Sequence, residues 1–486
     1  MRWLLGLLLA LGLGVAAEAQ PRKPRVAIVS IELAAVPNLA RAAARKVEDR
    51  MTVDLYGLGG GLLPSLESAD LAAYDLVLVE GVGPQLLNFA DRIEAAKAKT
   101  KVVVVNGERW IQGNVAPASL PDLQAYWTNA TEENYAALFD YLGVRLLDLP
   151  GSAAPPRIYP DAAFYHPAAP GPFADRAAYE AWAAGRFADA ATRPRIGLLF
   201  YRSLVLSKNA AVIDALIGEV ERQGGLPVPL WRKDSAESLA TLAPPERPID
   251  ALILCSNWID YADHAAGAEA ARGLDVAVLN CTSDYRRTPE QWAAEPGGFA
   301  PDRTGQLALS EIEGIVEPMM VGARALGPDG TAINTPIAHQ VTWRVGRALA
   351  WARLKRLANS EKRLVIPYFS EGRNQADVGS DPDSYLDAQG SLVVLLERLK
   401  AEGYDLGDQP LPDKAALSRL MAERGSNPRT PAEIAARVAE RCFYSLEAPV
   451  LRVGGYHTPY PASANEEAYL PGLDRVLDAV DRALAY

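Results

Sequence analysis

A polar turn that follows an apolar segment is the first place in this chain where the residue types could bind a ligand. Residues 196–201 form a short apolar run, which predicts a strand covered on both faces. In an open α/β sheet, ligands bind at the carboxyl ends of the strands, where a guanidinium could pair with a carboxylate. The alternative is that the turn residues only cap the next helix. The candidate ligand-binding residues of this turn are Arg202, Ser203, Ser207 and Asn209.

Candidate metal ligands are few. The four histidines are His166, His264, His339 and His457. No CxxC or HExxH pattern occurs, so we do not expect a structural zinc site. His339 precedes a basic helix and His457 lies in a Gly-rich aromatic loop, and both are candidate metal ligands. The pattern nevertheless favours surface or helix-capping histidines at both positions.

A second polar loop follows the apolar residues 363–369. It holds four carboxylates that could ligate a cation, those of Asp377, Asp381, Asp383 and Asp387. Their spacing is not that of a calcium loop, so the pattern favours turn-forming, solvated Asp residues. Arg373 lies in the same loop, with a solvated loop charge as its alternative. We take Arg373 and Asp387 as further candidate ligand-binding residues.

Two of the three cysteines, Cys255 and Cys281, end consecutive predicted strands. They could form a disulfide if those strands are neighbours in the sheet, and buried free thiols are the alternative.

Alternating strands and helices must position these residues. Apolar runs predict strands at 25–31, 52–56, 75–80 and 101–106 in the first part of the chain. A second series is predicted at 196–201, 226–230, 250–255 and 275–281, with a further strand near 314–321. Helical patterns lie between them. This alternation predicts an α/β fold made of several doubly wound, Rossmann- or flavodoxin-like domains with parallel sheets.

The domain boundaries follow from composition. Residues 20–150 are expected to form an N-terminal α/β domain. Residues 151–194, rich in Pro and Ala and then helical around 176–190, are expected to form a connector over the surface. Residues 195–359 are expected to form a second α/β domain. Residues 360–486 are expected to form a third α/β region, with a strand at 363–369 and a helical tail.

Length, charge and the N-terminus restrict the class of protein. The chain has 486 residues, enough for more than one domain, and a net charge of −11, which argues against a nucleic-acid partner. Residues 1–19 resemble a signal peptide: a basic start, an apolar stretch and a small-x-small site at Ala17 to Ala19. We expect a mature chain from Gln20 that is periplasmic or secreted and has no transmembrane span. An uncleaved N-terminal anchor is the alternative.

Five blocks, in order, resemble the N-terminal half of the large subunits of the CobN-type cobaltochelatase and magnesium chelatase family. The match spans roughly residues 25 to 406. Within the last block, Leu386-Asp387-Ala-Gln-Gly-Ser391-Leu-Val-Val-Leu-Leu resembles the family's LDTPASLVVLL step, from which residues 388–390 depart. The blocks are Tyr126-Trp127 with Glu133-Asn134; residues 195–230; Asn280 and Ser283 with Trp292; residues 311–318 (Glu-Ile-Glu-Gly-Ile-Val-Glu-Pro); and residues 360–396.

The resemblance implies the binding of a tetrapyrrole, such as haem, a porphyrin or a corrin precursor, for insertion or removal of Co, Mg or Fe. It also implies that ATP acts only through partner ATPase subunits, and that a separate catalytic half is a possible partner. Two features depart from the family: the export signal, and an end near the point where the family's larger catalytic half would begin. A non-catalytic periplasmic ligand-binding or scaffold protein is the alternative.

The resemblance also suggests roles for the candidate residues. Arg202 and Arg373 would pair with ring propionates, and His339 and His457 would be ligands of the metal. Three aromatic residues that follow predicted strands could stack on a macrocycle, although ordinary packing is favoured: Trp258, Tyr261 and Trp292.

Overall fold

The computed structural model of the protein describes residues 22–30, 35–58, 63–81, 84–106, 111–232, 237–295, 304–327, 332–366, 387–424 and 473–484. The expected signal peptide lies outside these residues, as do the candidate residues Arg373 and His457 and the three loop carboxylates of Asp377, Asp381 and Asp383. The chain divides into two compact units, Met1–Leu357 and Ala358–Tyr486.

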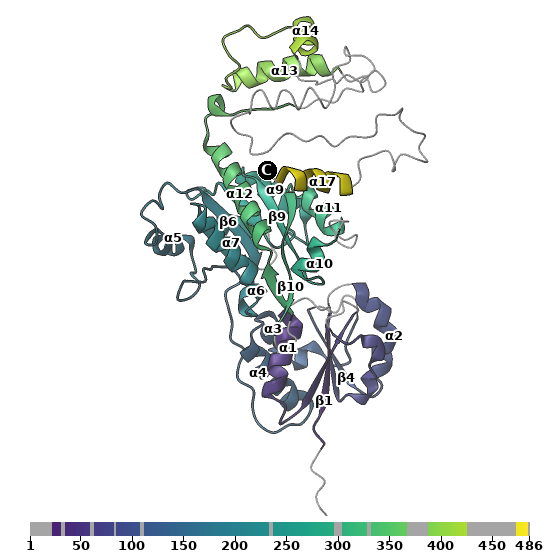
Figure 1. Ribbon diagram of the computed structural model, residues 1–486. Helices are drawn as coiled ribbons and strands as arrows, with labels where there is room; N and C mark the ends of the chain where they lie inside the picture. Colours follow the sequence, from purple (N-terminus) through teal and green to yellow (C-terminus); the bar gives the residue numbers. More distant parts are fainter. Residues whose placement is uncertain are drawn as a thin grey trace, which may run out of the picture. The chain divides into compact units, whose positions relative to one another are not determined.

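The first sheet contains four parallel strands in the order β2-β1-β3-β4. They are β1 (Arg25–Ser30), β2 (Thr52–Gly57), β3 (Leu76–Glu80) and β4 (Lys101–Val105). Alternate residues of each strand point to opposite faces, and both faces are covered, which explains the uninterrupted apolar runs. Helices α1 (Ala35–Lys46), α3 (Leu123–Thr128) and α4 (Glu132–Leu146) pack on one face. The 3-10 helix η3 (Pro84–Phe89) and α2 (Ala90–Ala96) pack on the other (Figure 1).

The second sheet contains seven strands in the order β11-β10-β9-β8-β6-β7-β5. Its five central strands are parallel, and an antiparallel strand lies at each edge. The order of its parallel strands repeats that of the first sheet and adds a fifth. Both follow the flavodoxin-like, doubly wound order, which confirms the predicted fold class. The strands are β5 (Ala163–Phe164), β6 (Arg195–Tyr201), β7 (Leu226–Arg232), β8 (Ala251–Leu254), β9 (Val278–Asp284), β10 (Val316–Leu326) and β11 (Ala332–Pro336).

Helices cover both faces of the second sheet as well. The face with α7 (Ala211–Arg222) and α12 (Ala338–Arg356) forms one buried apolar cluster. The face with α5 (Arg176–Ala184), α8 (Glu237–Leu242) and α9 (His264–Leu274) forms another. Three further helices lie near the strand ends: α6 (Arg202–Leu206), α10 (Pro289–Ala293) and α11 (Thr304–Ile312).

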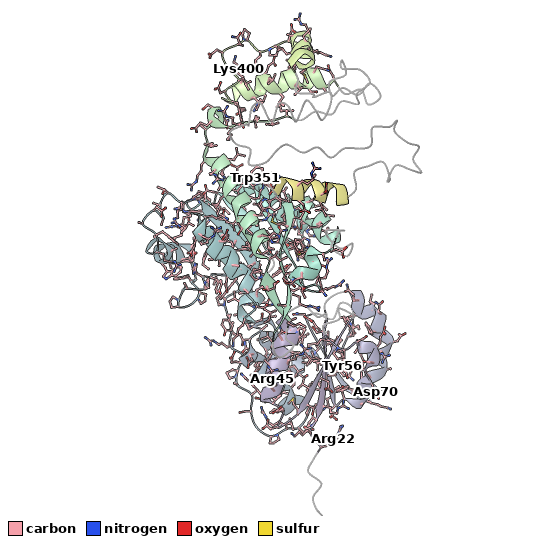
Figure 2. All side chains as sticks on the ribbon, viewed as in Figure 1. Arg22, Arg45, Tyr56, Asp70, Trp351 and Lys400 are labelled. Atoms are coloured by element: carbon pink, nitrogen blue, oxygen red, sulfur yellow. The ribbon has the colours of Figure 1, made fainter. Side chains whose placement is uncertain are left out.

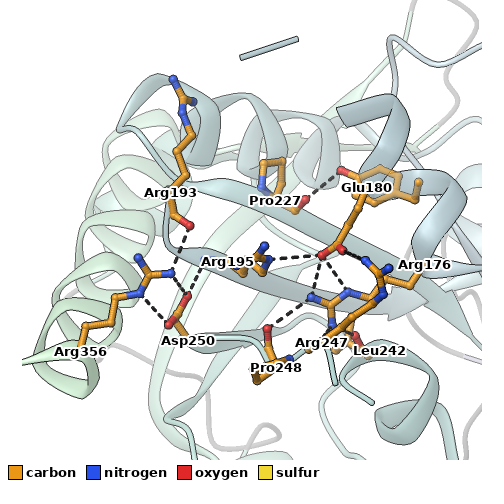
Figure 3. Close-up of polar contacts among 11 residues, drawn as sticks. Arg176, Glu180, Arg193, Arg195, Pro227, Leu242, Arg247, Pro248, Asp250 and Arg356 are labelled. Atoms are coloured by element: carbon orange, nitrogen blue, oxygen red, sulfur yellow. Dashed lines mark hydrogen bonds and ion pairs between the residues drawn. The ribbon is translucent and has the colours of Figure 1, made fainter. Parts of the chain in front are cut away.

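Both sheets begin with the same hydrogen-bonding arrangement. A Pro-Arg pair opens the first parallel strand of each sheet, β1 and β6, and an Asp precedes the third, β3 and β8. The Asp75 carboxylate accepts the backbone N–H of Arg25 at 2.7 Å in the first sheet. The Asp250 carboxylate accepts that of Arg195 at 2.6 Å in the second and also binds the Arg356 guanidinium at 2.8 Å (Figure 3). The repeated arrangement fixes the register of the first and third strands at the amino edge of each sheet.

The structure differs from the sequence predictions at three places. The predicted turn 202–209 contains the short helix α6. The expected surface connector 151–194 contains the predicted helix, α5, but it also adds β5 to the second sheet, and its residues Phe164 and Tyr179 are fully buried. The strand predicted at 363–369 is wrong over its described residues 363–366, which are not a strand. Val365 is 90% exposed, and within the described ranges no strand pairs with this segment.

The second unit is described only as helices: the short η6 (Asn359–Glu361), α13 (Ala388–Ala401), α14 (Lys414–Arg424) and α17 (Leu473–Leu484). None of the helices in the described ranges combines the length and the apolar composition that a membrane crossing requires.

Candidate ligand-binding site

The carboxyl edge of the second sheet has a switch point between β6 and β8. The chain runs from β6 to β7 on one side and then returns to β8 on the other, so the loops after β6 and β8 diverge there. Ligands of doubly wound folds bind at such a point. The two loops are joined by the Tyr201 hydroxyl, which donates to the Ser256 carbonyl at 2.6 Å. The predicted turn 202–209 therefore lies at the position where this fold class binds ligands.

Arg202 is a buried junction between the first and second sheets. Its guanidinium donates to the carbonyls of Thr128 at 2.7 Å and Tyr159 at 2.9 Å, and to the Asp161 carboxylate at 3.1 Å. Burial lowers the pKa of Arg202, an effect that Asp161 partly offsets. Its contacts are with the protein itself, and the predicted ligand-binding role stays a prediction.

Asn209 belongs to a buried polar cluster at the same edge. Its Oδ1 accepts the backbone N–H of Asn334 at 2.8 Å, and Asn334 Nδ2 donates to Ser283 Oγ at 3.1 Å. Asn209 Nδ2, Asn334 Oδ1 and Ser207 Oγ are buried without a partner among the described residues. A buried polar atom left unpaired costs about 1–3 kcal/mol, so these atoms require water or a ligand.

Gly322 of β10 makes room for this cluster. A Cβ atom at this position would lie 2.5 Å from Ser283 Oγ and 2.7 Å from Asn334 Oδ1. Any other residue would therefore displace the two polar side chains.

An aromatic loop follows β8 on the other side of the switch point. Trp258 and Tyr261 have ring centroids 5.1 Å apart, and Tyr261 meets His264 edge-on at 6.4 Å. The Tyr261 side chain is exposed, whereas Trp258 Nε1 is buried without a partner in the described part of the chain. Ser310 Oγ supports the loop by donating to the Asn257 carbonyl at 2.7 Å.

The Glu313 carboxylate holds the His264 imidazole through a hydrogen bond. The Glu313 side chain is fully buried, and its Oε1 lies 2.6 Å from His264 Nδ1. The same carboxylate accepts the backbone N–H groups of Ile259 and Asp260. Sequence reasoning missed this pair because the partners are 49 residues apart. The available signal was the presence of Glu313 in the block 311–318 that resembles the chelatase family.

The remaining predicted site residues lie elsewhere. Ser203 is in α6, where its carbonyl accepts the N–H of Ser207. His339 is exposed in the first turn of α12, with its ring 6.4 Å from that of Trp292. Asp387 caps α13 in the second unit and pairs with Lys414 Nζ at 2.7 Å, which lowers the pKa of its carboxyl. Among the described residues, no group of three or more His, Cys, Asp or Glu could hold a metal ion.

Cys255 and Cys281 are free thiols on the neighbouring chain segments of β8 and β9. A hydrogen bond with Cys281, together with burial, raises the pKa of Cys255. Burial would also raise the pKa of Cys281, but the hydrogen bond with Cys255 and the nearby Arg344 guanidinium outweigh it, so this pKa is lowered.

A hollow of about 450 Å³ lies in the first domain, lined by residues 67–72, Arg92, Ala95 and Ala96. Asp70, labelled in Figure 2, caps a short helix at this hollow. The lining segments precede β3 and β4, so the hollow is at the amino ends of those strands. Because ligands of this fold class bind at carboxyl ends, we place the candidate site in the second sheet.

A family model and several curated relatives point to one family. Residues 124–480 match the family described as CobN/Magnesium Chelatase. The chain is 27% identical over 352 residues to the H subunit of the magnesium chelatase of Rhodobacter capsulatus, covering 66% of this chain and 29% of that protein. It is 26% identical over 246 residues to the CobN subunit of the aerobic cobaltochelatase of Sinorhizobium sp, covering 47% and 19%. The chain thus spans less than a third of the length of these curated relatives.

Two further similarities were found among solved structures and curated proteins. The structure of the catalytic subunit of cobaltochelatase from Mycobacterium tuberculosis has a TM-score of 0.47 and 22% sequence identity, covering 83% of this chain and 33% of that one. A stretch of 54 residues, 11% of this chain, is 61% identical to the beta subunit of the pyruvate dehydrogenase E1 component of Leifsonia xyli, of which it covers 16%.

Proposed function

The chain belongs to the CobN/magnesium chelatase family, and from this premise we propose that it is the tetrapyrrole-binding part of a chelatase large subunit. It would hold a porphyrin or corrin ring for metal insertion or removal. The observation that carries the proposal is the family match over residues 124–480, which includes the whole carboxyl edge of the second sheet. The alternative of a binding or scaffold protein without chemistry receives no support from the comparisons.

The ring would bind across the switch point of the second sheet. The polar cluster of Asn209, Ser283 and Asn334 offers an unpaired amide N–H and an unpaired carbonyl oxygen, which suit the carboxylate or amide substituents of a tetrapyrrole. The aromatic loop on the other side offers Trp258 and Tyr261 for contact with the flat face of the ring.

The metal ion would be a substrate of the reaction. The proposal includes cobalt, magnesium and iron as the metal, because porphyrin and corrin rings carry each of them. ATP would act only through partner ATPase subunits, and a separate catalytic half would be a second partner.

An absorbance titration with metal-free protoporphyrin tests ring binding. We expect a saturable shift of the Soret band with the wild-type chain from Gln20. Asn209→Ala should bind about tenfold more weakly, because a hydrogen bond to a charged group contributes about 1.5–3 kcal/mol. Glu67→Gln, in the hollow of the first domain, is the control and should bind like the wild type.

The absence of any shift in the wild type would reject the proposed function. If the wild type and Asn209→Ala bind the ring with equal affinity and both are folded, the ring does not contact the polar cluster.

We also propose that the protein is exported to the periplasm or secreted, on the basis of residues 1–19. Expression of the full chain in a Gram-negative host, followed by mass spectrometry of the periplasmic fraction, checks this. A mature protein that begins at Gln20 is the expected result, and a full-length protein confined to the cytoplasm would contradict it.

A further inference from the structure

We propose that His264 is the axial ligand of the metal in the bound tetrapyrrole, with Nε2 as the donor atom and Glu313 as the residue that positions the imidazole. The inference rests on the proposed function and adds to it the residue that meets the metal. A metal held in a tetrapyrrole needs only one donor from the protein, so a single well-oriented histidine is sufficient.

The Glu313 carboxylate determines which nitrogen of His264 is free. Both of its oxygens accept backbone N–H groups, Oε2 from Ile259 and Oε1 from Asp260. Because both oxygens act as acceptors, the proton between the two side chains is assigned to His264 Nδ1. In this tautomer Nε2 presents its lone pair. A carboxylate behind the imidazole is also the usual support of a metal-binding histidine, because it fixes the ring and makes it a stronger donor.

The neighbouring helix leaves space for this carboxylate. Gly267 of α9 faces Glu313, and a Cβ atom there would lie 2.7 Å from the carboxyl carbon. The helix thus has a glycine where the buried carboxylate needs space. Helix capping does not explain His264, because Asp263 caps α9 by accepting the backbone N–H groups of Ala265 and Ala266 at 3.0 Å.

The His264 imidazole can be reached from solvent. Its side chain is 23% exposed, and the edge-on ring of Tyr261, itself 61% exposed, lies beside it. The loop starts directly after β8 and so borders the switch point. Coordination is a ligand exchange at the metal. The Nε2 lone pair forms the new bond, a water molecule leaves the metal, and no electron is transferred.

Haem and metal-free protoporphyrin are the probes that separate the two proposals. Wild-type protein with haem should give the visible bands of an imidazole-ligated iron. In His264→Ala these bands should be lost, whereas binding of metal-free protoporphyrin should stay within about twofold of the wild type, because that ring offers no metal to coordinate. Imidazole added to His264→Gly should restore the bands. His339→Ala, which removes an exposed histidine from α12, should behave like the wild type.

Glu313→Gln tests the positioning role. Iron coordination should weaken about tenfold, and the reduction potential of the bound haem should rise, because a weaker donor stabilises the oxidised iron less. A purely structural role for Glu313 would change stability without moving the potential.

Three outcomes would overturn the inference. Imidazole-type bands that persist in His264→Ala would place the ligand elsewhere. Binding of both rings to the wild type without such bands would reject His264 as a ligand and leave the proposed function intact. If neither ring binds, both proposals fail.

Discussion

At the residue scale, the two described histidines with carboxylate partners differ in their exposure to solvent. His264 is partly exposed, whereas the His166 side chain is 3% exposed and packs near Trp182. The backbone N–H of Ala168 donates to His166 Nδ1, so the proton of the neutral ring lies on Nε2, which faces Glu221 at 3.1 Å. Burial lowers the pKa of His166, although Glu221 opposes the shift. His166 is therefore a structural histidine that folds in its neutral form.

This state predicts a pH dependence of stability. Because the pKa of His166 is lower in the folded protein than the usual 6.5, the unfolded chain binds more protons as the pH falls through 6.5. The free energy of unfolding should decrease in that range and level off below the folded-state pKa. Urea denaturation at pH 7.5 and pH 5.5 measures the loss.

His166→Gln cannot titrate and should show a smaller loss between the two pH values, whereas His339→Ala should show the same loss as the wild type. An unchanged loss in His166→Gln would contradict the assignment.

At the element scale, the amino edge of the second sheet is held by ion pairs, and the carboxyl edge is left for the site. Glu180 of α5 binds the guanidinium groups of Arg176 at 3.0 Å and Arg195 at 3.4 Å, and a further one from Arg247 (Figure 3). Asp250 adds two interactions at this edge. Its carboxylate accepts the backbone N–H of Arg195 at the start of β6 and binds the Arg356 guanidinium at the end of α12. The charged side chains at the amino edge are therefore paired with one another, whereas the unpaired polar atoms of the candidate site lie at the carboxyl edge.

Asp250→Ala should lower the free energy of unfolding by about 2–3 kcal/mol. The substitution leaves the Arg195 N–H without its acceptor and removes the partner of Arg356, and a buried donor that loses its partner costs about 1–3 kcal/mol. Chemical denaturation measures the change.

Lys355→Ala, one residue before Arg356, removes a partly exposed pair with Asp275 and should cost less than about 1 kcal/mol. Equal effects of the two substitutions would show that the Asp250 arrangement does not hold the edge together.

At the scale of the Met1–Leu357 unit, the two sheets are joined by a few polar contacts. Arg202 reaches the last carbonyl of α3, and the Asn38 side chain of α1 pairs with both backbone groups of Ala332 in β11. The connection through residues 157–159 is held by Asn129 and Asn134, which bind its backbone. These contacts cross between the domains directly at the carboxyl edge, where the site lies.

Arg202→Ala should destabilise the unit by about 3 kcal/mol, because it removes a buried charge and strips the Thr128 and Tyr159 carbonyls of their donor. The segment 151–162 should also become more sensitive to protease. Denaturation and limited proteolysis with mapping of the cut sites measure the two effects.

Arg222→Ala, which removes an exposed pair with Glu219 on α7, is the matched control and should leave the free energy of unfolding close to that of the wild type. A protease pattern that is identical in the wild type and Arg202→Ala would contradict the role of Arg202 as a junction.

The sequence by itself determined the fold class and most of the strands. Runs such as Leu76–Glu80 and Arg195–Tyr201 are largely apolar because both faces of a parallel sheet are covered, and this is a local property of the chain. The strand predicted at 363–369 shows the limit of the same signal, since an apolar run forms a strand only where a neighbouring strand pairs with it. The end of the strand at Tyr201 was also predicted, because the end of a buried strand is visible in the sequence, whereas the turn expected after it contains helix α6.

Only the tertiary structure decided which side chains meet. His264 and Glu313 are 49 residues apart, and Arg202 and Thr128 are 74 apart. The strand order β9-β8-β6 brings the loops after β6 and β8 to one edge, and that order is set by how the helices pack on both faces. The sequence therefore identified residues that could bind a ligand, whereas the fold placed Arg202 in a buried junction and brought the His264 imidazole to the Glu313 carboxylate.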